Sequence, residues 1–257
     1  MRIITSADDF GYCEDTVRAT IECLEAGTLT GASIMANMPG TALAVAYARA
    51  NPERSFGVHL TFAAGHSEAP VLPPQEIPGL VAPGGTFLPP NRVRLLALSN
   101  RLPVEQIAAE AAAQIGCLLD QGVRVSHVDS HFHMHKLPPF QKALRDVLPR
   151  FGITRVRNVQ NVYTIRPLKS PTYWLGALWR RSLVRSFTTT PHFFMDADGQ
   201  DDRWPEQVLE RVRDGVLEVG VHPGYAEDWR NQERLRLGRF TEAAARAGHT
   251  LIPWTAL

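Results

Sequence analysis

The stretch Arg2-Ile-Ile-Thr-Ser-Ala-Asp8-Asp9-Phe10-Gly11 decides the expected fold. Its apolar start, residues 2–7, predicts a short buried strand. Residues 13–26 follow with apolar positions at helical spacing, and Gly27 marks the helix end. A strand, a turn and a helix in this order make a β/α unit, the building block of parallel sheets. Asp8 and Asp9 stand where that first strand is expected to end.

Strand and helix patterns alternate along the rest of the chain. Further strands are expected at residues 32–36, 56–60, 123–130, 154–159, 216–222 and 250–254, and helices at 41–49, 104–121, 139–148, 204–214 and 230–247. Seven or eight such units predict an α/β protein with a distorted (β/α) TIM-like barrel, closed or nearly closed. We find neither an internal repeat nor a linker and expect a single domain over residues 1–257.

The composition is that of an ordinary globular protein. The 257 residues are 44% hydrophobic and 21% charged with a net charge of +1, which gives no reason to expect a nucleic-acid partner. The three cysteines, Cys13, Cys23 and Cys117, are widely spaced and suggest thiols in a reducing compartment. No signal peptide is visible, and no apolar run reaches the ~18 residues of a membrane span. We therefore expect a cytoplasmic protein, and the oligomeric state stays open.

Two segments depart from the β/α pattern. Residues 63–92 are rich in proline and glycine and predict a long loop, the kind that often forms a lid or a binding surface. Residues 160–190 form a basic, tryptophan-bearing insertion, since no acidic residue occurs between Asp146 and Asp196. Within it, residues 173–185 predict an amphipathic helix suited to peripheral contact with a membrane. The alternative is a helix that caps the barrel or contacts another copy.

A cluster of histidines follows the strand expected at 123–130. It reads His127-Val-Asp129-Ser-His131-Phe-His133-Met-His135, and in an extended segment the alternate residues share one face. The cluster is too long for all its members to reach one ion. We predict His131 as a metal ligand and Asp129 as the acceptor that orients a ligand histidine. His133 and His135 are then predicted to contact substrate or loop.

Hydrolysis of an amide needs a nucleophile, a Lewis acid at the carbonyl oxygen and a proton for the leaving amine. Asp9, His59 and one histidine of the 131–135 run could hold a divalent ion, with Asp8 as the general base. His222, at the end of an expected strand and before Pro-Gly, is placed to act as the general acid. Each residue also has a simpler explanation. Asp8-Asp9 could cap the next helix, His59 could be a core histidine, and His222 could merely flank a turn.

These motifs together resemble the YdjC-like family of carbohydrate deacetylases (ChbG/HpnK type), which includes chitooligosaccharide deacetylases and hopanoid-biosynthesis proteins. The motifs are Ala7-Asp8-Asp9-Phe10-Gly11, Gly57-Val58-His59-Leu60, the 127–135 histidine cluster and Val221-His222-Pro223-Gly224, with 189–194 as a weaker match. Ser6 and Phe132 depart from the residues common in the family.

The resemblance implies a distorted (β/α) barrel that hydrolyses the N-acetyl group of an amino sugar. It further implies a divalent metal at Asp9, His59 and His131, with Asp8 as base and His222 as acid. Arg157 looks like the family's arginine near the site.

The substrate and the metal are open at this level. The basic helix favours a lipid-linked substrate of the hopanoid N-acetylglucosaminyl type, and a soluble chitooligosaccharide is the alternative. One carboxylate and two imidazoles suit Zn²⁺, and Mg²⁺, Mn²⁺, Co²⁺ or Ni²⁺ are further candidates. Two other functional classes are alternatives. A metallophosphoesterase would need more carboxylates for two metals, and a non-catalytic sugar-binding barrel would need neither a base nor an acid.

Overall fold

The computed structural model of the chain describes residues 1–66, 68–164, 171–196 and 202–257. Within these ranges seven parallel strands form one sheet, with the order β4-β3-β2-β1-β6-β5 and with β7 beside β1. The strands are β1 (Arg2–Phe10), β2 (Gly31–Ile34), β3 (Ser55–Leu60), β4 (Val125–Ser130), β5 (His192–Met195), β6 (Val216–Val221) and β7 (Thr250–Leu251).

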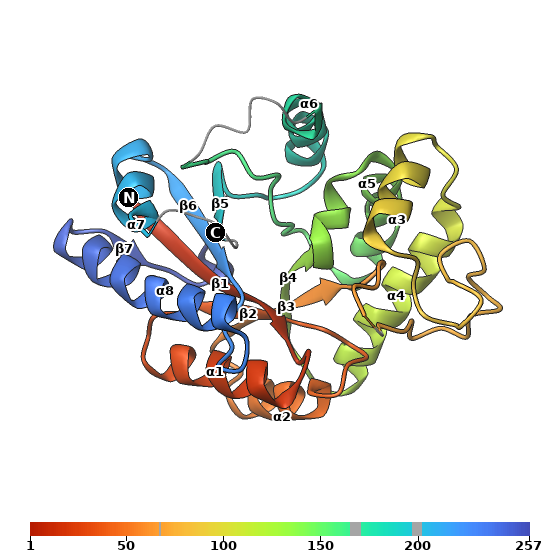
Figure 1. Cartoon of the computed structure of the whole chain (residues 1–257), viewed down its shortest axis with the longest axis horizontal. Helices are drawn as coiled ribbons and strands as arrows, with labels where there is room; N and C mark the ends of the chain where they lie inside the picture. Colours follow the sequence, from red (N-terminus) through yellow and green to blue (C-terminus); the bar gives the residue numbers. More distant parts are fainter. Residues whose placement is uncertain (67, 165–170, 197–201) are drawn as a thin grey trace.

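Helices surround this curled sheet (Figure 1). They are α1 (Glu14–Glu25), α2 (Thr41–Ala50), α3 (Pro90–Leu98), α4 (Val104–Asp120), α5 (Pro138–Val147), α6 (Pro171–Ser186), α7 (Trp204–Arg211) and α8 (Asp228–Arg246). The prediction of a distorted TIM-like barrel is confirmed. Helix α3 and strand β5 were not predicted, because neither carries a clear period in the sequence.

The distortion lies between β4 and β5. The strand predicted at 154–159 is wrong as a regular element, because the segment makes only isolated bridges from Val156 to Val128 and from Arg155 to Thr188. The next residues, Asn161 and Val162, donate their backbone N–H groups to the Phe193 carbonyl at 3.1 Å. The curled sheet is therefore joined across this gap by irregular backbone instead of a full strand. The strand predicted at 250–254 is likewise shorter, since it ends at Leu251.

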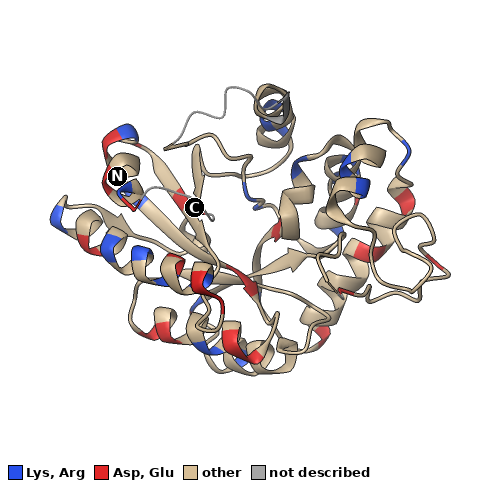
Figure 2. Ribbon diagram, in the orientation of Figure 1, with Lys and Arg blue, Asp and Glu red and all other residues tan. Residues whose placement is uncertain are grey.

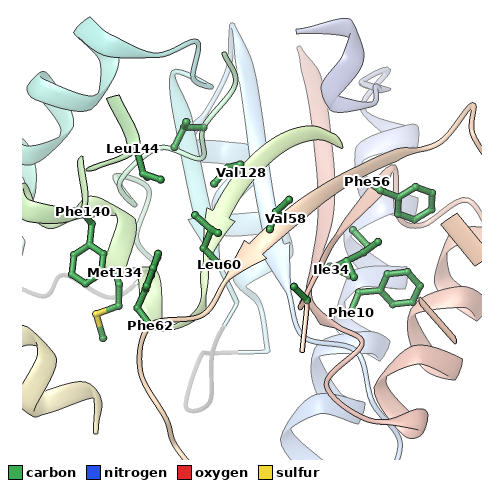
Figure 3. Packing of buried hydrophobic residues seen from close by; sticks show 14 of the residues in the cluster. Phe10, Ile34, Phe56, Val58, Leu60, Phe62, Val128, Met134, Phe140 and Leu144 are labelled. Carbon is green, nitrogen blue, oxygen red and sulfur yellow. The ribbon is translucent and has the colours of Figure 1, made fainter. Parts of the chain in front are cut away.

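Apolar side chains pack one face of the sheet, whereas the other face carries buried charged groups beside a small apolar cluster of Ile4, Val216 and Trp254. All residues of β1 except Arg2 are buried, as expected of a central strand that is paired on both edges. Phe10 and Phe56 stack with ring centroids 6.1 Å apart, and Ile34 lies beside them (Figure 3). Burying one such side chain contributes roughly 1.5–3 kcal/mol. This packing fixes the strands, and with them the positions at their C-terminal ends.

The proline-rich loop is packed against α4. Backbone N–H groups of Val71 and Leu72 donate to the buried Glu110 carboxylate at 2.9 and 3.0 Å. Gln106 accepts a third bond, from the Gly79 N–H at 2.7 Å. The loop also buries its own apolar residues Ile77, Leu80 and Phe87. From residue 68 to 89 the chain makes one isolated bridge, Val81–Phe87, and otherwise neither helix nor strand.

Helix α6 is the basic segment. It buries Trp179 and Leu183 and leaves Leu178 and Val184 58% and 50% exposed. Figure 2 shows Arg segments and no acidic segment on this helix. Among the described residues, no helix combines the length and the apolar character that crossing a bilayer requires.

Candidate active site

An unusual backbone turn brings Asp8 and Asp9 to the same cavity. Neighbouring residues of a regular strand point to opposite faces, but Asp9 has a φ of 58°, and the β1–β2 register shifts between Ala7 and Phe10. Aspartate tolerates this left-handed conformation better than most residues. The helix-cap alternative is wrong, because the N-cap of α1 is Cys13. The two carboxylates thus line one cavity from consecutive positions.

Asp9 faces two histidines. Its Oδ1 atom lies 3.3 Å from His59 Nε2 and 3.0 Å from His131 Nδ1, and the three candidate ligand atoms all lie within 4.8 Å of one another. Asp9 Oδ1 is buried and accepts no hydrogen bond of good geometry, whereas Oδ2 accepts one from Arg230 at 2.8 Å. Burial opposes ionisation, but the imidazoles of His131 and His59 hold the pKa of Asp9 well below its usual value. One orphaned carboxylate oxygen between two imidazole nitrogens fits a divalent ion.

His59 is held from behind by Asp129. The two residues are register partners on β3 and β4, and His59 Nδ1 lies 2.8 Å from Asp129 Oδ1. Ser33 donates to Asp129 Oδ2 at 2.9 Å. Burial alone would lower the pKa of His59, but Asp129 raises it to about 10. Because Nδ1 is occupied by Asp129, the Nε2 atom of His59 is left to face Asp9. Asp129 thus lies where we predicted the acceptor that orients a ligand histidine.

Arg157 joins three buried carboxylates. Its Nη1 atom lies 2.6 Å from both oxygens of Asp8 and 2.7 Å from Asp129, and its Nε lies 2.6 Å from Glu218. All four side chains are at most 2% exposed. Burial raises the pKa of Asp8, although the charge of Arg157 acts to lower it. Burial also raises the pKa of Glu218, to about 7. Asp8 is thus held in one orientation by a bond to a single nitrogen.

His222 approaches Asp8 from the other side of the cavity. It follows β6 directly, and its Nε2 atom lies 3.9 Å from Asp8 Oδ2. Glu233 on α8 lies 3.0 Å from His222 Nδ1 and accepts the His222 backbone N–H at 2.7 Å. Burial alone would lower the pKa of His222, but Glu233 raises it to about 9. At neutral pH this imidazole is therefore charged and can donate a proton.

The histidine cluster is not extended throughout, which corrects the shared-face expectation. Strand β4 ends at Ser130, and residues 131–136 turn back, with φ of 54° at both Phe132 and His133. Of the four histidines of this cluster, His131 and His133 line the cavity and the other two do not. His135 is fully buried with its Nδ1 2.7 Å from Ser130 Oγ.

His127 lies away from the cavity. It stacks on Trp254 with ring centroids 4.5 Å apart, and its Nδ1 lies 2.9 Å from Ser126 Oγ. This histidine is a buried core residue, and the turn after Ser130 separates it from the three later histidines of the cluster.

The cavity has a volume of about 460 Å³ and lies at the C-terminal ends of the strands. Aromatic side chains of Tyr12, Phe132 and Trp229 line it together with the cations of Arg94 and Lys136. Such a site offers ring faces for stacking and donors for hydroxyl groups, beside the carboxylates and histidines. These are the chemical means by which a protein holds a sugar ring.

Comparison with known proteins shows the family of the chain. Residues 2–250 match the model of the YdjC-like protein family. The chain belongs to the YdjC-like family. Carbohydrate deacetylases of Geobacillus stearothermophilus and Brevibacillus brevis are both 30% identical to it, over 225 and 232 residues. The matches cover 87% and 89% of this chain and 80% and 83% of those relatives.

Solved structures share the fold of this YdjC-like chain. A putative cellobiose-phosphate cleavage protein from Enterococcus faecalis superposes with a TM-score of 0.82 at 21% identity, over 99% of this chain and 98% of that one. A lactam utilization protein from Thermus thermophilus gives a TM-score of 0.57 at 14% identity, over 98% of this chain and 99% of that one. At these identities the likeness concerns the fold alone.

The charged residues of the YdjC-like site that the sequence reasoning missed include three that hold predicted site residues. Glu68 lies in the proline-rich loop, and Arg230 and Glu233 lie on α8. Each is nearly fully buried, at 1%, 5% and 0% exposure. Their local signal in the sequence is weak, because a glutamate in a loop or an arginine on a helix is ordinary unless its burial is known.

Proposed function

We propose that this YdjC-like chain is a metal-dependent carbohydrate deacetylase that hydrolyses the N-acetyl group of an amino sugar. The observation that carries the proposal is the convergence of Asp9, His59 and His131 beside Asp8 and His222 in one cavity. The names of the relatives from Geobacillus and Brevibacillus support the same reaction.

The proposed roles follow from the contacts. A divalent ion at Asp9, His59 and His131, with Zn²⁺ or Mg²⁺ as the first candidates, would polarise the acetyl carbonyl and acidify water. Asp8, oriented by Arg157, takes the proton from the attacking water. His222, charged beside Glu233, gives a proton to the leaving amine. One proton is taken and one is given, so the products are the free amine and acetic acid, which ionises to acetate; Asp8 then loses its proton to solvent and His222 regains one.

The contacts favour one ion over the two that a metallophosphoesterase would use. Asp8, His59 and Asp129 form a second group with ligand-like spacing. However, Nη1 of Arg157 lies within 2.7 Å of both carboxylates of that group. A guanidinium in this place repels a second cation, and it stabilises the same carboxylates without one.

For the substrate we propose a lipid-linked amino sugar of the hopanoid N-acetylglucosaminyl type. The support is helix α6, whose Leu178 and Val184 are exposed on a segment with arginines at 180, 181 and 185. Such a helix suits peripheral contact with the inner, anionic face of a membrane. A soluble chitooligosaccharide is the alternative, which requires only the aromatic lining of the cavity.

The decisive experiment is acetate release from a panel of N-acetylated sugars and glycolipids. Metal-stripped protein and Asp8→Asn serve as controls, and both should release little acetate. Absence of acetate from every substrate, with divalent metal present, would contradict deacetylation. Faster turnover of chitobiose than of glycolipid, with no binding to anionic liposomes, would contradict the lipid-linked substrate and leave the reaction standing.

A further inference from the structure

The two histidines that face Asp9 offer different nitrogens. His59 presents Nε2, at 3.3 Å from Asp9 Oδ1, and His131 presents Nδ1, at 3.0 Å from the same atom. A neutral imidazole has one nitrogen with a lone pair and one with a proton, so each ring must be held in the matching tautomer. Asp129 does this for His59 by accepting from Nδ1 at 2.8 Å. His131 needs an acceptor at its Nε2.

Glu68 stands at that place. Its Oε1 atom lies 3.5 Å from His131 Nε2, and its side chain is 2% exposed. Its other oxygen, Oε2, accepts the His66 backbone N–H at 2.8 Å, and its carbonyl accepts from Phe87 N–H at 3.0 Å. The carboxylate is thus held by the loop's own backbone and not by the sheet. An ionised carboxylate only accepts hydrogen bonds, so it selects the tautomer of His131 that carries its proton on Nε2.

We propose that Glu68 is a positioning residue that prepares His131 Nδ1 for metal binding, an inference that rests on the metal site of the proposed function. The metal site then has two ligand histidines, each backed by a carboxylate: His59 by Asp129 from a strand, and His131 by Glu68 from the proline-rich loop. Partners of this kind fix ring orientation and raise ligand basicity.

The position of Glu68 has a consequence for the loop. Residues 68–89 are attached to α4 through Glu110, which accepts from Val71 and Leu72. If Glu68 stabilises the metal-binding form of His131, bound metal must in turn stabilise the docked loop, because such coupling is reciprocal. Metal binding should therefore slow amide hydrogen exchange in residues 68–89, and this protection should need Glu68.

The test compares Glu68→Ala and Glu68→Gln with the matched control Glu76→Gln, which changes an exposed carboxylate of the same loop. Zn²⁺ affinity is measured by competition with a chelator, and the visible spectrum of the Co²⁺ form reports ligand geometry. Glu68→Ala should weaken Zn²⁺ binding about 10–100-fold and shift the Co²⁺ bands. Glu68→Gln should lose less, because its amide oxygen still accepts from Nε2. Glu76→Gln should match the wild type.

Urea unfolding of the metal-free proteins separates positioning from a merely structural role. Positioning predicts lower affinity, together with loss of metal-dependent exchange protection in residues 68–89. Wild-type affinity in Glu68→Ala would overturn the inference, whether or not the metal-free protein is less stable, and would leave the proposed function intact. A wild-type chain that binds no divalent ion would instead contradict the metal site itself.

Discussion

Two sides of the cavity hold their functional groups by different means. We call the first the buried side; its members stand on strands or bridge them, and they are Asp8, His59, Asp129 and Arg157. We call the second the open side; its members come from a turn, a loop, a strand end and a helix, and they are His131, Glu68, His222 and Glu233. The His59 side chain is 1% exposed, whereas those of His131 and His222 are 12% and 20% exposed.

The difference shows where the site can change. On the buried side, backbone register sets the contacts, as for His59 beside Asp129. On the open side, single carboxylates do so, as Glu233 does for His222. A change on the buried side should therefore disturb folding and chemistry together. A change on the open side should alter metal affinity or proton transfer while the fold remains.

The largest expected effect separates Asp8 from Asp9. Asp8→Asn removes the proposed base and should lower kcat about 10²–10⁴-fold, the range typical of general-base catalysis. It should leave metal affinity nearly unchanged, because Asp8 lies on Arg157 and outside the ligand trio. Asp9→Asn should weaken both, since Asp9 Oδ1 faces both ligand histidines. Steady-state kinetics measure kcat of both variants, and metal titration measures their metal affinity.

The control for this pair is Asp214→Asn, because the Asp214 side chain is 97% exposed. It should change neither activity nor metal affinity. If Asp8→Asn lost metal as fully as Asp9→Asn did, Asp8 would be a ligand and the proposed division of roles would be wrong.

The second prediction concerns the buried side as a network. Arg157→Met removes the cation shared by Asp8, Asp129 and Glu218, all fully buried. Breaking a buried ion pair by removing one partner costs about 3–5 kcal/mol, so the free energy of unfolding in urea should fall by that order. The exposed Arg150, changed to Met, should move it by less than about 0.5 kcal/mol. If both variants lost the same free energy of unfolding, the residues of the buried side would not form a network that stabilises the fold.

The same difference between the two sides explains which parts of the structure could be predicted from the sequence. Local patterns predicted β1, β3, β4 and β6 and the residues at their ends, because a buried parallel strand is a short apolar run followed by a turn. They missed β5, which has four residues, and gave a strand at 154–159, where the backbone makes only isolated bridges. Those features depend on partners far away in the chain.

For the site, the sequence pattern indicated the residues at the strand ends but did not indicate the residues that orient them. Asp9 and His131 could be placed in one cavity from the sequence, but the left-handed backbone at Asp9 and Phe132 that makes this possible has no local signature. Glu68 and Glu233 reach the histidines by tertiary packing, from another loop and another helix. Sequence spacing cannot indicate such pairs without the fold.

The smallest expected effect tests the open side through Glu233. The charged groups facing His222 are Glu233 on α8 and Asp8 and Asp9 on β1, and against burial Glu233 contributes most to raising the pKa of His222 to about 9. Because the proposed acid acts when protonated, activity should fall as pH rises through that value. Glu233→Gln keeps an acceptor for the His222 N–H but removes the charge. The basic limb of kcat/KM should therefore move down by roughly 1–2 pH units.

The exposed Glu242 of the same helix provides the matched control, and Glu242→Gln should leave the pH profile unchanged. Glu233→Gln should also cost much less unfolding free energy than Arg157→Met, since His222 can release its proton when Glu233 is neutralised, whereas loss of Arg157 leaves three buried carboxylates without their cation. A basic limb that stays near pH 9 would mean that another group donates the proton. A stability loss as large as that of Arg157→Met would place Glu233 with the buried side. The distinction between the two sides therefore depends on this variant showing a shifted pH profile in a protein that remains folded.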